Sequence, residues 1–229
     1  RLITTSTRGR SGQGVSFGNN SYYNNISNNT FINNTNDILV SSTSLSTLSC
    51  ANVVYGNLDA NGRQIRYYNS TVGTDADNTV LSALVLCDAD NSTINNVTIN
   101  NTGYLNNGVL LFLMNNSVIN NSVFTDTASG LYLTFDSMNN TVSNSRMDNG
   151  ILGIYILRGA LNNTIVNNTV VDNFDNGIDF NSLAGNHNNI SNNNISRNVR
   201  QGINIFSGSY TIINNNTIQA NLVHSILLS

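Results

Sequence analysis

Short runs of apolar residues, here called pulses, alternate with paired asparagines along most of this chain. In residues 162–180, the apolar pairs at 165–166 and 170–171 each follow two asparagines and a threonine, and a third pulse follows Gly177. No element longer than about four residues fits between those asparagines. The pattern therefore excludes an ordinary helix and a long strand.

The same phrase repeats every 23–25 residues, a period that is typical of a solenoid. Each copy opens on an apolar residue: Ile94, Val118, Val142, Ile165, Ile190 and Ile213. An asparagine stands two positions later, as it does in an earlier copy that opens at Ile26: Asn28, Asn96, Asn120, Asn144, Asn167, Asn192 and Asn215. Further along, a glycine introduces an alternating apolar strand in five copies: Gly108, Gly130, Gly153, Gly177 and Gly202.

Each repeat predicts one coil of an all-β parallel β-helix, with three very short strands and three corners. A single coil cannot bury its own apolar residues, so coils must stack about 4.8 Å apart with like residues above like. Asparagine tolerates a left-handed corner, and stacked asparagines can hydrogen-bond along the axis. We therefore expect the seven repeated asparagines to form an inward-facing ladder.

Two parts of the chain break the rhythm. Residues 1–18 hold no repeat phrase, and we expect an N-terminal segment or cap there. Residues 19–40 fit a first coil, whereas residues 41–82 predict irregular coils with a hairpin or flap, because DANG after Leu58 is a strong turn signal. Regular coils are expected over 83–229, with an uncapped last strand, and a start without Met suggests a mature form or a fragment.

Composition supports this picture and removes some functions. The chain has 48 asparagines, its 12 acidic residues are all Asp, and its 9 basic residues are all Arg. Good helix formers are therefore scarce. A net charge of −3 gives no basic field for nucleic acid, and the longest apolar run is too short to span a bilayer.

The phrases GIYIL and NNTIVNNTV resemble right-handed parallel β-helix repeats of the periplasmic copper-processing type and of carbohydrate-binding and sugar-hydrolase domains. Residues 56–68 and the phrase from Cys87 to Ile94 are similar to segments of archaeal cell-surface proteins of this type. The resemblance covers about residues 24–229. It implies a right-handed β-helix and leaves function open, because this scaffold carries many activities, metal maturation among them.

The acidic residues of the regular coils are the weak candidates for catalysis: Asp126, Asp148, Asp172 and Asp175. The first three fall at similar offsets in successive coils, so they are expected along one edge, as an acid pair of a sugar hydrolase would be. The acid motifs of pectin hydrolases are absent, however. A protein without catalysis is the favoured expectation.

Metal and cysteine chemistry have little support. Asp88 with Asp90, or Asp75 with Asp77, offers oxygen ligands to Ca²⁺, but solvated turn aspartates are the ordinary explanation, and we expect no cofactor. Cys50 and Cys87 are the only cysteines. They fit either a disulfide between the insertion and the first regular coil, in an oxidising compartment, or two buried thiols.

Aromatic residues and N-x-[ST] sequons are the remaining signals. Aromatics that could stack on sugars, or equally fill the core, are Tyr67, Tyr68, Tyr104, Tyr132, Phe135, Tyr155, Phe174, Phe180 and Phe206. The sequons predicted to face outward are at Asn69, Asn91, Asn115, Asn139, Asn162 and Asn189. A chain this rich in Asn, Ser and Thr also yields sequons by chance.

Two hypotheses about function follow. The leading one is a glycosylated structural protein of a cell-surface layer or extracellular filament, archaeal in origin, which associates with itself through solenoid ends or edges. The alternative is a carbohydrate-binding or polysaccharide-cleaving β-helix. Neither needs nucleic acid or a transmembrane segment.

Overall fold

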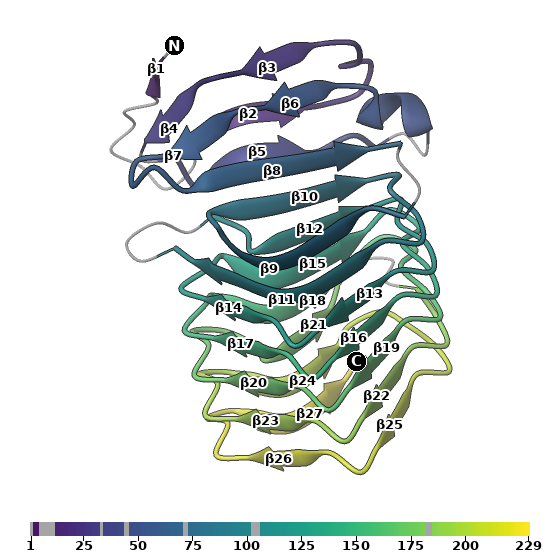
Figure 1. Cartoon of the computed structure of the whole chain (residues 1–229). Coiled ribbons are helices and arrows are strands. Elements are labelled where there is room, and N and C mark those ends of the chain that lie inside the picture. The colour runs from purple at the N-terminus through teal and green to yellow at the C-terminus, as the bar shows by residue number, and fades with distance from the viewer. Residues whose placement is uncertain are drawn as a thin grey trace.

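Stacked coils of short strands form the main body of the computed structural model, which describes residues 2–4, 12–32, 34–43, 46–70, 73–101, 106–181 and 185–229 (Figure 1). Of the predicted N-terminal cap, residues 1 and 5–11 lie outside the described residues, as does Tyr104. Within the described ranges, no helix is long and apolar enough to cross a membrane.

The coils contribute to three rows of parallel strands, as the repeat predicts. The first row belongs to an 11-stranded sheet and contains β10 (Ala83–Cys87), β12 (Val109–Phe112), β15 (Ser129–Thr134), β18 (Leu152–Ile156), β21 (Ile178–Phe180), β24 (Gln201–Ile205) and β27 (His224–Leu228). The second row contains β13 (Val118–Asn120), β16 (Thr141–Ser143), β19 (Thr164–Val166), β22 (Asn189–Ser191) and β25 (Ile212–Asn214). The third contains β14 (Val123–Thr125), β17 (Arg146–Asp148), β20 (Thr169–Val171), β23 (Asn194–Ser196) and β26 (Thr217–Gln219).

A long strand joins the second and third rows at their N-terminal end. β11 (Thr93–Asn100) pairs with both β13 and β14, and β9 (Asp75–Leu81) lies on its other side. Parallel pairing throughout these rows stacks one coil on the next.

Equivalent residues of successive coils stack on one another in the core. One predicted core residue, Val118, is replaced by its neighbour Ile119. Ile94 pairs with Ile119, which is fully buried, whereas Val118 is 38% exposed. Val118 and Ile119 are both β-branched, so the sequence alone did not distinguish the inward residue. The side-chain alternation of the strand decides it.

Glycines line one column of the stack because the coils approach too closely there for a side chain. A Cβ at Gly177 would lie 2.7 Å from the carbonyl oxygen of Gly202, and one at Gly130 would lie 2.8 Å from that of Gly153. The repeated glycine thus serves coil stacking rather than a turn.

Residues 12–59 form an N-terminal unit that extends the first-row sheet at its N-terminal end and covers part of the outer face of that sheet. Its elements are β2 (Gln13–Phe17), β3 (Asn25–Ser27), β4 (Thr30–Ile32), β5 (Asn36–Val40), the 3-10 helix η1 (Thr47–Cys50), β6 (Val53–Tyr55) and β7 (Asn57–Asp59); β1 (Leu2–Thr4) pairs with β4. β7 pairs antiparallel with β8 (Gln64–Asn69) around the turn at residues 59–62. This reversal separates the unit from the parallel stack (Figure 1).

The first-row sheet consequently has an apolar core on each face near its N-terminal end. Leu84 and Leu86 of β10 face the solenoid interior, whereas Val85 and Cys87 of the same strand belong to a second core. The N-terminal unit contributes Phe31 and Val40, among others, to that second core, and neighbouring strands of the sheet contribute residues such as Phe112. The outward-facing Tyr132 of β15 still packs against this second core.

Cys50 and Cys87 form a disulfide that fastens the N-terminal unit to β10. The Tyr67 hydroxyl donates to the carbonyl of Cys50 at 3.0 Å, and the Asn69 amide donates to the carbonyl of Asn52 at 2.7 Å. Of the two alternatives that the sequence left open, the structure has the disulfide.

Candidate functional site

The candidate acids lie at the third corner of the coils, which follows the third row of strands. Asp126, Asp172 and Arg197 occupy the same left-handed position in different coils, with φ of 55°, 60° and 57°. Asn149 stands between the two aspartates in the stack, and Asp148 lies one position earlier, at the end of β17. The acids therefore share an edge, as expected, but do not form one facing pair.

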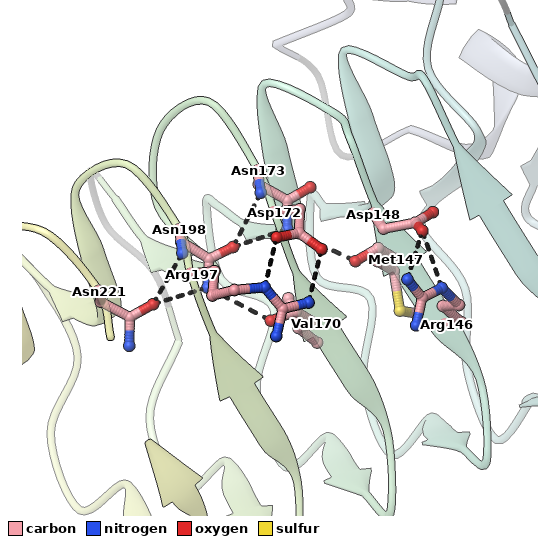
Figure 2. A network of polar contacts seen from close by, with 9 residues as sticks. All are labelled: Arg146, Met147, Asp148, Val170, Asp172, Asn173, Arg197, Asn198 and Asn221. Atoms are coloured by element: carbon pink, nitrogen blue, oxygen red, sulfur yellow. Dashed lines mark hydrogen bonds and ion pairs between the residues drawn. The ribbon is translucent and has the colours of Figure 1, made fainter. Parts of the chain in front are cut away.

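Arginines pair with Asp148, Asp172 and Asp175, and the first two of these pairs are drawn in Figure 2. Arg197 donates to both oxygens of Asp172 at 2.7 Å, and this pairing lowers the pKa of the carboxyl. Arg146 pairs with Asp148 at 2.7 Å, and Arg200 lies 3.4 Å from Asp175. A general acid needs a raised pKa, so Asp172 is poorly suited to that role. The Arg197–Asp172 and Arg200–Asp175 pairs join adjacent coils, whereas Arg146 and Asp148 lie on the same strand, β17.

The predicted asparagine ladder lies one residue out of phase. Asn28, Asn96, Asn144, Asn167, Asn192 and Asn215 do adopt the left-handed conformation, but their side chains are exposed. In the copy that contains Asn120, the left-handed residue is Asn121. Because a left-handed residue turns its side chain outward at these corners, the residue after it points inward.

Inward-facing Asn and Ser side chains make the actual ladders. They are Ser92, Ser117, Asn140, Asn163 and Asn188 at the first corner, Ser122, Ser145, Asn168, Asn193 and Asn216 at the second, and Asn173, Asn198 and Asn221 at the third. Each side-chain oxygen accepts from the backbone N–H of the equivalent residue in the preceding coil. The ladders thus satisfy buried corner donors that no strand pairs.

The sequons follow from the same corner geometry. Residues 162–164 and 167–169 both read as a left-handed Asn, a ladder Asn and a Thr that begins a strand. Asn91, Asn139 and Asn162 are exposed, whereas Asn69, Asn115 and Asn189 are half-buried. The fold accounts for the N-x-T spacing without a glycan, so glycosylation stays a prediction.

The other candidate ligands are dispersed. Asp90 accepts from the backbone N–H of Asn115 at 2.6 Å, and Asp88 accepts from the Ser70 hydroxyl at 3.3 Å. In the described part of the chain, no three His, Cys, Asp or Glu side chains gather as metal ligands would. Calcium binding at these turns stays untested.

A groove of about 390 Å³ opens on the outer face of the first-row sheet, where the N-terminal unit ends. Asn36, Leu39, Val40 and Ser41 form one wall. Its floor and far side include Tyr132, Phe135, Tyr155, Leu157 and Arg158. The groove therefore combines an aromatic floor with a cationic rim.

Tyr132 and Tyr155 are paired residues of adjacent strands, β15 and β18. Their half-buried rings lie 5.1 Å apart between centroids, with 32° between their planes. Burial raises the pKa of both hydroxyls, for Tyr155 to about 12. Both phenols therefore stay protonated near neutral pH and can donate hydrogen bonds.

Charged groups stand at two sides of the tyrosine pair. The Arg158 guanidinium lies 4.7 Å from the centroid of the Phe135 ring, and its side chain is exposed. Asp179 pairs with Tyr155 in the next coil, and burial raises the pKa of its carboxyl. The Asn204 amide donates to Asp179 at 2.6 Å. The outer face thus offers donors and acceptors beside an aromatic surface.

A family model described as the right-handed β-helix region matches residues 82–229, well over half of the chain. The chain belongs to the right-handed β-helix family. The matched part of this β-helix contains the tyrosine pair and all four candidate acids. No curated protein matches the sequence.

Two solved structures resemble this β-helix. The A-module of the mannuronan C-5 epimerase AlgE4 of Azotobacter vinelandii aligns with a TM-score of 0.53 and 15% identity, over 96% of this chain and 59% of that one. The A-module of AlgE6 from the same organism aligns with a TM-score of 0.40 and 14% identity, over 86% and 62%. This β-helix therefore spans about three fifths of either module, and at such identity the likeness shows the fold alone.

Sequence reasoning named the aromatic residues of this β-helix but did not gather them. Phe180 is fully buried, Tyr67 and Phe135 are nearly so, and Phe174 is 65% exposed at a corner. Tyr132 and Tyr155 stand at the outward position of the GLYL and GIYI phrases. That recurrence was the available signal, but the wall formed by β5 comes from a distant segment that the repeat does not predict.

Proposed function

We propose that this β-helix binds polysaccharide along the outer face of its first-row sheet, over Tyr132 and Tyr155. The observation that supports it most is the half-buried pair of neighbouring tyrosine rings, tilted by 32°, on the floor of the groove. Carbohydrate rings have apolar faces and polar edges, and an aromatic floor with a few polar groups at its rim matches both.

Support also comes from the position of the groove. The first-row strands run one above another, so the outer face continues beyond the tyrosines to Asp179 and Asn204. A linear polymer lying along the solenoid axis can contact a new coil about every 4.8 Å. The name of one structural neighbour, a mannuronan epimerase, makes a polysaccharide a reasonable class of ligand to test.

The disulfide bears on where such binding would take place. Disulfides persist in oxidising compartments, so Cys50–Cys87 supports an extracellular or cell-surface location. An extracellular polysaccharide is then the ligand class we favour.

Affinity gel electrophoresis against a panel of neutral and acidic polysaccharides tests the proposal. We expect at least one polymer to retard the wild type, and a variant with Tyr132→Ala and Tyr155→Ala to bind it at least about tenfold more weakly. Phe174→Ala is the matched control, because Phe174 is an exposed aromatic outside the groove. Absence of retardation by every polymer, or equal weakening by Phe174→Ala, would contradict the proposal.

A self-associating surface subunit is the second candidate, favoured by the last coil. Ile226 and Leu228 of β27 are 40% and 67% exposed, although their partners in β24, Ile203 and Ile205, are buried. Another coil stacked on β27, whether from a continuation of this chain or from a second copy, would cover them. A filament requires β27 of one copy to stack on the opposite end of the next copy.

Sedimentation velocity distinguishes this candidate. The wild type should associate more at higher protein concentration, and Leu228→Asp should remain monomeric over the same range. Monomers at every concentration, or unchanged association in Leu228→Asp, would rule out assembly through β27.

A further inference from the structure

Strand β5, one wall of the groove, is attached to the solenoid through a buried carboxylate. Asp37 is 6% exposed and lies between the groove residues Asn36 and Leu39. Its backbone N–H donates to the Asn106 side-chain oxygen at 3.2 Å, and the Asn106 amide donates back to the carboxylate at 3.0 Å. Asn34 donates to the other carboxylate oxygen at 3.1 Å.

No cation is paired with this carboxylate in the described structure, although one lies nearby. Arg63 is engaged by Asp59, which it contacts at 2.6 Å through one nitrogen and 2.7 Å through another. The charged groups that act on Asp37 are Asp59, which disfavours its ionised form, and Arg63, which favours it. Two neutral amides and an arginine that is already paired with Asp59 compensate a buried negative charge incompletely.

A small polar cavity adjoins the carboxylate. It has a volume of about 20 Å³ and is lined by Asp37, Asp59, Arg63, Asn101 and Asn106, among others. The Asn101 side-chain nitrogen, in a residue 2% exposed, has no hydrogen-bond partner. The cavity is large enough for a single water beside the carboxylate.

We propose that Asp37 acts as a pH-sensitive latch: protonation of its carboxyl strengthens the attachment of β5, and with it the groove wall, to the solenoid. The attached strand is called seated below. Burial, chiefly, raises the pKa of Asp37 to about 6 in the seated state. Release of β5 returns the carboxyl to water and to its ordinary pKa near 3.8. A group with a raised pKa binds its proton more tightly when seated, so seating is favoured at low pH and loses that gain as the pH rises through 6.

The size of the effect follows from the two pKa values. Between pH 5 and pH 7.5 the equilibrium constant for release of β5 should rise about tenfold. The latch stands independently of any ligand, but its effect on binding rests on the proposed polysaccharide function.

Hydrogen exchange of residues 36–41, corrected for intrinsic rates, measures release directly. We expect the tenfold rise in the wild type and in the control Asp172→Asn, and no rise in Asp37→Asn. Asp59→Asn removes the repelling charge and frees Arg63, so the midpoint of the rise in hydrogen exchange should move to lower pH. A rise that persists in Asp37→Asn, or a wild type without any rise, would overturn the latch.

Polysaccharide retention at pH 5 and pH 7.5 forms the second arm. Asp179 pairs with the groove residue Tyr155, and its carboxyl also has a raised pKa. Only a pH dependence that Asp37→Asn removes therefore counts as evidence for the latch. Suppose that hydrogen exchange rises with pH, but that the pH dependence of polysaccharide retention is the same in the wild type and in Asp37→Asn. This result would overturn the coupling between the latch and the groove. If hydrogen exchange rises with pH but no polysaccharide retains the protein at either pH, the polysaccharide function is overturned and the latch is still supported.

Discussion

Asn167 and Asn168 are adjacent in sequence, yet their side chains lie on opposite sides of the second corner. Asn167 adopts φ of 57° and is exposed, whereas Asn168 is 1% exposed. The Asn168 oxygen accepts from the backbone of Ser145, and its amide donates to the carbonyl of Val142 and to Asn193. Asn167 therefore allows the chain to turn, and Asn168 forms hydrogen bonds with buried backbone groups.

Replacement of the two residues should have unequal effects on stability. Asn168→Ala leaves the Ser145 N–H and the Val142 carbonyl unpaired in the interior, so we expect a loss of about 2–4 kcal/mol. Asn167→Gly keeps the left-handed corner and should change stability by less than about 0.5 kcal/mol. Urea denaturation of both variants measures this difference, and comparable losses would show that the ladder assignment is wrong.

Close stacking predicts the response of the glycine column. A Cβ at Gly177 would lie 2.7 Å from the Gly202 carbonyl oxygen and 2.8 Å from Ile195, so Gly177→Ala should cost about 2 kcal/mol or more. Gly18→Ala is the control, because nothing lies within 4 Å of a Cβ at that position. Thermal unfolding should separate the two variants, and equal melting temperatures would contradict close stacking at Gly177.

The disulfide should contribute strongly to the stability of the N-terminal unit. It closes a loop with a sequence separation of 37, for which chain entropy gives about 4 kcal/mol. A reductant should therefore lower the melting temperature of the wild type and leave unchanged that of a variant with Cys50→Ala and Cys87→Ala. A wild type insensitive to complete reduction would show that other contacts hold the unit.

The Asp172–Arg197 pair should give a small effect that depends on pH and salt. Its lowered pKa means that the pair stabilises the fold above the ordinary Asp pKa of 3.8 and loses this contribution as the pH falls through the folded value. The pair is exposed, so Asp172→Asn should change stability little at pH 7, and less in high salt. A large loss at pH 7 would show an additional role for this carboxylate. Unchanged polysaccharide binding in Asp172→Asn is also expected.

The sequence predicted the solenoid well because coil stacking repeats the same physical demands in every turn. Ile165, Ile190 and Ile213 recur because each must fill the same layer of the core. It was harder to predict which of two adjacent residues in a coil points into the core. Paired asparagines and paired β-branched residues make adjacent positions look alike, as Val118 and Ile119 do, and only the side-chain direction separates them.

The candidate site was predicted less well because its parts come from segments outside the repeat. The position of β5 over the outer face depends on the strand reversal at residues 59–62 and on contacts such as Asp37 with Asn106. The sequence analysis expected a turn at DANG, but the contact between Asp37 and Asn106 has no signature in the repeat pattern. Likewise, the spacing of the acids predicted a shared edge, but not the arginines that pair with them, of which Arg197 and Arg200 come from the next coil.

Hydroxyl-radical footprinting with and without a bound polysaccharide tests the central claim most directly, because it reports which side chains the ligand covers. Tyr132 and Tyr155 should become protected from oxidation, while Phe174 and Tyr210, which are 65% and 77% exposed away from the groove, should not. Protection of Phe174 or Tyr210 with unchanged oxidation of Tyr132 and Tyr155 would contradict binding on the outer face of the first-row sheet.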